Sequence, residues 1–204
     1  MSKRAQVMNA RGTTRKKDAR SGLLTRLGWR VSMDRIIIGG SILFSLVIVG
    51  VIAVNSVLNQ IPTVDPTLPD ESETVMIQSA EHVESGASHV SYNSNPPTSG
   101  PHYAQPVGWG VYREVLPDET VIHNLEHGGI WISYRDADDE DTIAQLVDIA
   151  RRYPSHVILT HRPANDSPIA VAAWGRQFKL DTFDSGAIYN FITRYRFKGP
   201  ESTL

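Results

Sequence analysis

Residues 36–58 read IIIGGSILFSLVIVGVIAVNSVL, a run of 23 residues without a charged side chain. Its polar content is limited to three serines and one asparagine. Because an α-helix rises about 1.5 Å per residue, a helix of this length crosses a hydrocarbon core of roughly 30 Å with slight tilt. The run is longer than the roughly 7–15 apolar residues of a cleavable signal peptide. Val54 and Asn55 also interrupt a small-x-small cleavage pattern after Ala53. The sequence therefore predicts one uncleaved transmembrane helix.

The residues before this segment are strongly basic. Ten of the chain's 20 Lys and Arg, but only two of its 22 Asp and Glu, lie in residues 1–35. Because basic flanks stay on the cytoplasmic side of a membrane, we expect a cytoplasmic N-terminus and an extracytoplasmic C-terminal part. Topology and attraction to anionic lipids account for such a tail, so it requires no nucleic acid or protein partner.

The rest of the chain divides into a spacer and one domain. Residues 59–74, NQIPTVDPTLPDESET, contain three prolines and a cluster of acids, a composition typical of a spacer that lifts a domain off the bilayer. Residues 75–200 are enough for a single hydrophobic core. We therefore expect a basic cytoplasmic tail at 1–35, a signal-anchor helix at 36–58, a spacer at 59–74 and an extracytoplasmic domain at 75–200 of a single-pass cell-membrane protein.

The composition excludes several kinds of chemistry. The chain has no cysteine, which excludes disulfides, thiolate metal sites and cysteine nucleophiles. After residue 35 it has twice as many acidic as basic residues, so we expect no nucleic-acid partner there. The expected partners are the membrane itself and other proteins of the cell envelope.

Hydrophobic periodicity within the domain predicts an α+β fold. The segment 138–152 begins with acids, ends with Arg151 and Arg152, and carries apolar residues at helical spacing. The segment 184–197 shows the same apolar stripe before Lys198-Gly199-Pro200. These two packed helices on a mixed sheet match an α+β sandwich. The expected elements are helices at Asp138–Arg152 and Asp184–Phe197, strands at Gly129–Tyr134, His156–Thr160 and Ile169–Trp174, and weaker strands near Val111 and Val121.

All seven histidines lie in the predicted domain, and four of them fall in two dense polar stretches. The first stretch, Ser88–His102, includes His89 and ends in Asn95-Pro96-Pro97-Thr98-Ser99-Gly100-Pro101-His102. Three prolines and a glycine make a stiff loop, which would hold His102 in one place at little entropic cost. The seven are His82, His89, His102, His123, His127, His156 and His161.

The second stretch, His123-Asn124-Leu125-Glu126-His127-Gly128-Gly129, contains the His-x-x-Glu-His pattern of inverted zincins. We interpret Val121–Ile122 as the start of a strand, and two glycines follow the pattern directly, so the context disfavours a zinc peptidase helix. In an extended chain the two imidazoles of the pattern would lie about 13 Å apart. A shared ion therefore requires a helical turn or a bend here, with His102 arriving from the stiff loop. The candidate ligands are His102, His123 and His127, with Glu126 as candidate general base and zinc, copper or iron as the candidate ion.

Three functions fit these residues, and the sequence leaves them open. The first is a module that binds a metal ion or a small polar ligand through the clustered histidines. The second is a non-enzymatic assembly or scaffold factor of an envelope complex, in which the histidines form a structural polar network. The third is a metal-dependent hydrolase. A serine hydrolase built on Ser99 and Asp118 lacks the Gly-x-Ser-x-Gly elbow that would support it. Whether the domain is an enzyme, and its oligomeric state, stay open.

Four blocks follow one another in a characteristic order: Pro96–His102, Trp109–Tyr112, His123–Gly129 and Ala173–Gln177. Together they resemble the bacterial family called domain of unknown function 3105, over about Met76–Pro200. The resemblance implies one N-terminal membrane span, as in many members, and points to the two histidine blocks as the site. Members often have a cysteine just before the Gly-Val-Tyr block, where this chain has Gly108-Trp109-Gly110, so no thiol chemistry carries over. The family implies no established activity.

Overall fold

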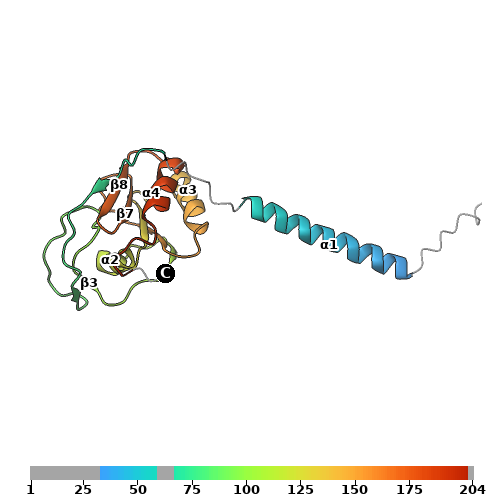
Figure 1. Ribbon diagram of the computed structural model, residues 1–204, viewed down its shortest axis with the longest axis horizontal. Helices are drawn as coiled ribbons and strands as arrows, with labels where there is room; N and C mark the ends of the chain where they lie inside the picture. The colour runs from blue at the N-terminus through green and yellow to red at the C-terminus, as the bar shows by residue number, and fades with distance from the viewer. Residues whose placement is uncertain (1–32, 59–66, 202–204) are drawn as a thin grey trace, which may run out of the picture. The chain divides into compact units, whose positions relative to one another are not determined.

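The computed structural model describes residues 33–58 and 67–201 of the chain (Figure 1). The chain divides into two units, the first ending at Asn55 and the second beginning at Ser56. The basic tail up to residue 32 and residues 59–66 of the predicted spacer lie outside the described residues.

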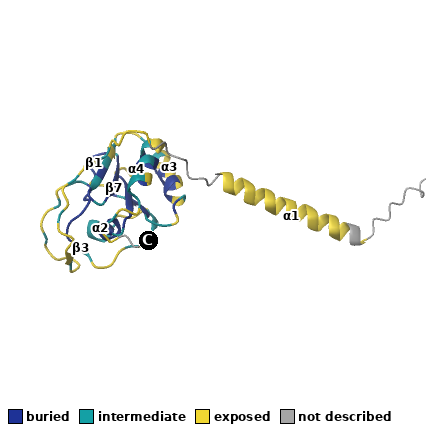
Figure 2. Ribbon diagram, in the orientation of Figure 1, coloured by how far each residue is buried: buried dark blue, intermediate teal, exposed yellow. Residues whose placement is uncertain are grey.

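The described part of the first unit lies within helix α1, Met33–Leu58. Residues Ile36–Val57 form a stretch of 22 residues with a mean hydropathy of 2.7, long and apolar enough to cross a membrane. Figure 2 shows the helix exposed along its described length. Two of its serine hydroxyls are satisfied locally, since Ser41 and Ser45 each donate at 2.9 Å to a backbone carbonyl of the preceding turn. A helix with its polar groups satisfied internally suits an apolar medium.

The second unit is built on a six-stranded mixed sheet with the order β1-β8-β7-β5-β6-β4, which confirms the predicted mixed sheet. Strands β4 and β5 run parallel to β6, while the other neighbours are antiparallel. The three strands predicted with most support and the weaker one near Val111 are confirmed as β5, β6, β7 and β4. The strands are β1 Glu73–Thr74, β4 Gly110–Tyr112, β5 Ile130–Tyr134, β6 Val157–His161, β7 Ile169–Ala173 and β8 Arg176–Leu180.

Two helices cover one face of this sheet, and both were predicted. Helix α3, Glu140–Arg151, and helix α4, Ser185–Tyr195, bury their apolar stripes against alternate residues of the central strands. Each begins at an aspartate whose carboxylate accepts from a backbone N–H three residues later, at 3.1 Å for Asp139 and 3.0 Å for Asp184. We call this side of the sheet the apolar face.

The opposite face carries a third helix, α2, Asp118–Glu126, and here the prediction of a strand near Val121 was wrong. β-branched residues favour strands, but two physical factors override that preference. Acidic residues occupy the first turn, where they complement the helix dipole. Val121 and Leu125, one helical turn apart, are fully buried in a cluster with Trp131 of the sheet. The domain therefore has three packed helices rather than the expected two.

A small ladder completes the fold beside α2. Strand β2, His82–Val83, pairs in parallel with β3, His102–Tyr103, so that His82 lies directly opposite His102. Helix α2 contacts β3, and both lie apart from α3 and α4 in Figure 1. We call the side formed by α2, β2 and β3 the histidine face.

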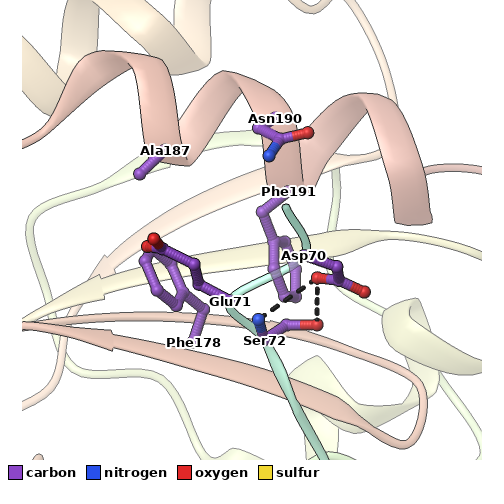
Figure 3. A pocket seen from close by; sticks show the side chains of 7 residues that line it. All are labelled: Asp70, Glu71, Ser72, Phe178, Ala187, Asn190 and Phe191. Atoms are coloured by element: carbon purple, nitrogen blue, oxygen red, sulfur yellow. Dashed lines mark hydrogen bonds between the residues drawn. The ribbon is translucent and has the colours of Figure 1, made fainter. Parts of the chain in front are cut away.

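Residues 67–74, the described end of the predicted spacer, lie against α4 and β8. Asp70 accepts hydrogen bonds from the backbone N–H and hydroxyl of Ser72, at 3.1 and 2.7 Å, and from Tyr195. Figure 3 shows Asp70 and Ser72 beside Phe178 and Phe191. These four residues line a cavity of about 20 Å³. Burial alone would raise the pKa of Asp70, but its hydrogen bonds and the charge of Arg176 outweigh that effect and lower the pKa to about 2. The chain is thus fixed to the domain before β1 begins.

Candidate metal centre

Four side chains converge on the histidine face. His82 comes from β2, His102 from β3, and His123 and Glu126 from α2. Each side chain offers one atom that could bind a metal ion, either a ring nitrogen or a carboxylate oxygen. These four atoms all lie within 4.8 Å of one another. The Glu126 Oε2 atom lies 3.0 Å from His102 Nε2 and 3.9 Å from His82 Nε2. His102, His123 and Glu126 are buried, whereas His82 is exposed.

The stiff loop before His102 is buried, from residue 96 to residue 102. His102 itself has no exposed surface, and its Nδ1 lies 2.9 Å from the carbonyl oxygen of Gly100 in the same loop. Ser99, also fully buried, accepts a hydrogen bond from the backbone N–H of Gln78 at 3.0 Å. The loop therefore holds His102 as its prolines suggested, and the Ser99 hydroxyl ties the loop to the preceding segment.

Helix α2 presents His123 and Glu126 on one side, because residues three apart on a helix are neighbours. Two contacts fix the helix in place. At its start, Asp118 accepts from two nitrogens of the buried Arg162, at 2.8 and 2.7 Å. In its last turn, the Asn124 side chain accepts from the N–H of Val107 at 3.0 Å and donates to its carbonyl at 2.8 Å. Asp118 is therefore engaged by an arginine and does not form part of a serine triad.

Backbone carbonyls orient two of the imidazoles. The Nδ1 atoms of His102 and His123 lie 2.9 Å and 2.7 Å from the carbonyl oxygens of Gly100 and Tyr103. A carbonyl oxygen only accepts, so each Nδ1 carries a proton and donates it, which leaves the Nε2 lone pair of the neutral ring for a metal ion. Burial lowers the pKa of His123, an effect that its hydrogen bond to Tyr103 opposes and the neighbouring histidines reinforce. His123 is thereby kept in the neutral form that binds metals.

His82 connects this group to an open groove of about 500 Å³, which is lined by residues 82–85, 103–107 and Thr120. Its side chain is 48% exposed, against 4% for Glu126. The exposure of His82 leaves this side of the group open to the solvent of the groove. His82 was not among the predicted ligands, because it is brought to the group by its pairing with His102 across β2 and β3.

Not all of the residues predicted as metal ligands or general base belong to the converging group. His102, His123 and Glu126 belong to the converging group, but His127 follows the end of α2 and lies outside that group. Its Nε2 is 3.0 Å from the Nε2 of His123. The helix required by the inverted zincin pattern does form and ends before Gly128, whose φ is 79°. Glu126, however, contacts His102 among the donors, so the geometry differs from that of an inverted zincin.

The remaining histidines make other contacts. His89 Nε2 lies 3.1 Å from a carboxylate oxygen of Glu119. His156 stacks on Trp109 with a ring-centroid distance of 4.6 Å, and His161 lies 3.2 Å from the carbonyl oxygen of Arg135. These contacts are those of structural histidines. Among the residues that the structure describes, the group of four converging donors consists of three imidazoles and one carboxylate.

This donor set suits zinc, copper or iron. Ligand atoms about 2.0–2.2 Å from one tetrahedral ion lie roughly 3.3–3.6 Å apart. Since the four ligand atoms lie within 4.8 Å of one another, binding requires the widest pair to close by up to about 1.5 Å. Since His82 is exposed, rotation of its side chain can supply that movement.

Comparison with known proteins identifies one relationship. The family model described as "Protein of unknown function (DUF3105)" matches residues 82–204, more than half of the chain and a range that includes all four converging side chains. Searches of curated proteins and of solved structures found no match.

Proposed function

We propose that this chain, which belongs to the family of unknown function DUF3105, binds a divalent transition-metal ion through His82, His102, His123 and Glu126. The observation that supports the proposal is the convergence of four potential metal ligands within 4.8 Å, three of them on buried side chains. Several electron-rich atoms facing one another in a buried site need a cation to offset their repulsion and their lost hydration.

The orientation of the rings supports the same assignment. Hydrogen bonds from ligand imidazoles to backbone carbonyls are a regular feature of protein metal sites, where they fix the ring and raise its basicity. His102 and His123 both make such bonds. With three neutral imidazoles and one carboxylate, a divalent ion would leave the site with a single positive charge, which favours an anionic or polar ligand arriving through the groove beside His82.

Glu126 is better suited to binding the ion than to acting as a general base. Its Oε2 atom is 3.0 Å from His102 Nε2 and belongs to the converging group. A base that activates water must be free to accept a proton from that water. The structure therefore favours metal or ligand binding over the hydrolase hypothesis.

We further propose that α1 anchors the protein in the cell membrane, with the basic tail in the cytoplasm and the metal site outside it. The length and apolar character of Ile36–Val57 and the ten basic residues before it support this topology. Protease added to intact spheroplasts should digest the domain and spare the tail. Recovery of the full-length protein in the soluble fraction, or protection of the domain, would contradict the topology.

Elemental analysis of the full-length protein, purified in detergent without a histidine tag, tests the metal proposal. After incubation with zinc, copper or iron and removal of excess ion, we expect about one ion per chain. His102→Ala and His123→Ala should lose the ion. The control His161→Ala should keep it, because that ring, at the end of β6, contacts the Arg135 carbonyl and Tyr134 of β5 and does not belong to the converging group. Absence of metal from the wild type, with melting unchanged by a chelator, would instead favour a structural histidine network in an assembly factor.

A further inference from the structure

His127 lies outside the converging group and yet faces one of its members. The Nε2 atoms of His127 and His123 are 3.0 Å apart, and their rings are 4.9 Å apart at an interplanar angle of 30°. His127 is only partly buried, whereas His123 is 6% exposed. The pair thus links the buried donor group to the protein surface at the end of α2.

The hydrogen bonds of the two rings determine what can lie between them. His123 Nδ1 is 2.7 Å from the carbonyl oxygen of Tyr103, and His127 Nδ1 is 3.2 Å from the carbonyl oxygen of Glu201. Both Nδ1 atoms must donate, because a carbonyl oxygen only accepts. In the neutral rings, both Nε2 atoms therefore present lone pairs to each other at 3.0 Å. Such a contact is repulsive unless the two nitrogens share a cation.

The distance suits a metal ion. Two ligand nitrogens about 2.0–2.1 Å from one tetrahedral ion lie roughly 3.3–3.4 Å apart, close to the separation of this pair. His123 has only one lone pair available, because its Nδ1 proton is used on Tyr103. It can therefore bind an ion in the inner group or an ion held with His127, but not both at once.

The segment after α4 holds the His127 ring in this position. The backbone N–H of Glu201 donates to the Glu126 carbonyl at 3.1 Å, and that of Phe197 donates to the Gly128 carbonyl at 2.8 Å. Gly199 lies so close that a Cβ atom there would come within 2.0 Å of the Glu126 carbonyl oxygen. Backbone hydrogen bonds to the residues immediately before and after His127 thus hold its ring in place.

From this geometry we infer that His127 and His123 form an outer metal subsite, through which a divalent ion enters and leaves the inner group by exchange at His123. The inference rests on the proposed function, since it requires the inner group to bind a metal ion. It assigns the ion the role of an exchangeable cargo or ligand, with His127 as the side chain that receives it first. Water molecules would complete the coordination of the ion in the outer position, and no bond other than metal–ligand bonds forms or breaks.

Stopped-flow absorption with Co²⁺ as the probe tests this inference on the full-length protein in detergent, because cobalt bound by nitrogen and oxygen ligands absorbs visible light. The wild type, His127→Ala and His127→Gln are compared at one pH, with His161→Ala as the control. We expect one Co²⁺ per chain in all four, with a dissociation constant within about threefold of the wild-type value. Loading, and removal by a chelator, should both be slowed about tenfold or more in the two His127 variants, which corresponds to about 1.4 kcal/mol of barrier.

The possible results separate the two proposals. Unchanged loading and removal rates in both His127 variants would overturn the outer subsite and leave the inner site intact, as expected if the two rings share only a proton. Loss of Co²⁺ from both His127 variants, with the metal-free melting temperature preserved, would also overturn it, because His127 would then be a permanent ligand. No Co²⁺ bound by the wild type would overturn the proposed function itself.

Discussion

The two faces of the central sheet are built on different principles. On the apolar face, α3 and α4 bury aliphatic and aromatic side chains against the central strands, and the stabilisation is spread over many residues. On the histidine face, α2 buries three apolar side chains, while His123, Asn124 and Glu126 of the same helix are buried polar groups. Buried polar groups are costly unless each has a partner. The comparison shows one face that stabilises the fold and another on which polar side chains are buried together, each of them needing a partner.

The largest expected effect is a loss of stability on the apolar face without loss of metal binding. Leu146 of α3 is fully buried in the main core. Replacement by alanine removes buried methyl groups and leaves a cavity, so Leu146→Ala should lower the free energy of unfolding by about 2–5 kcal/mol. Denaturant titration with a chelator present measures this loss, and elemental analysis measures the ion. A stable variant that had lost its ion would show that the two faces are not separable in this way.

Metal removal should have the next largest effect and should act only through the histidine face. A ligand present at about 100 times its dissociation constant stabilises the folded state by about 2.7 kcal/mol. We expect this difference between zinc-loaded and metal-free wild type in thermal unfolding, and none for His123→Ala. Leu146→Ala should gain the same free energy of unfolding from zinc as the wild type, although its metal-free form is less stable. An equal increment in His123→Ala would place the bound ion elsewhere.

Replacement of His82 should reduce the affinity for zinc more than it reduces the stability of the fold. His82 is the one exposed member of the converging group, so its replacement by alanine leaves three donors and a packed domain. His82→Ala should weaken zinc binding at least tenfold, about 1.4 kcal/mol. The metal-free unfolding free energy should change by no more than about 0.5 kcal/mol, as for most surface substitutions. Competition with a chromophoric chelator gives the affinity. A metal-free protein as unstable as Leu146→Ala would contradict the assigned role.

The smallest expected effect is the pH dependence of a histidine outside the metal centre. A hydrogen bond from His89 to Glu119, assisted by the Val90 carbonyl, raises the pKa of His89 above its ordinary value of 6.5. Because the folded-state pKa is raised, this stabilisation is fully present below pH 6.5 and is lost as the pH rises through the folded-state value. His89→Gln should therefore reduce the unfolding free energy by up to about 1 kcal/mol near pH 5.5 and by almost nothing near pH 8.5. A difference that grew with pH would contradict this assignment.

The same contrast explains how much could be predicted from the sequence. Helices α3 and α4 have apolar residues at helical spacing and aspartates at their starts, so local pattern and tertiary packing agree. The strands β5, β6 and β7 are short apolar runs that are buried in the sheet. Local pattern and tertiary packing agree here too, so their positions could be predicted. Strand β8 was missed because its sequence, Arg176–Leu180, is mostly polar and its pairing with β7 comes from the turn at Gly175, whose φ is 69°.

On the histidine face, local pattern and structure disagree. Val121 and Ile122 favour a strand by themselves, but the acidic first turn and the burial of Val121 and Leu125 against Trp131 favour a helix. His102, His123 and Glu126 were identifiable because they lie in dense polar blocks. His82 was not, since its place depends on a strand pairing between residues 20 positions apart. Long-range pairing of this kind leaves no local trace in the sequence.

Anomalous diffraction from crystals of the zinc-loaded, full-length protein tests the central claim most directly. The account predicts one strong peak at the zinc edge, about 2.0–2.2 Å from a nitrogen of His82, His102 and His123 and from a carboxylate oxygen of Glu126. A map with no peak among these four side chains, or with its single peak on other residues, would contradict the assignment of this group as the metal centre.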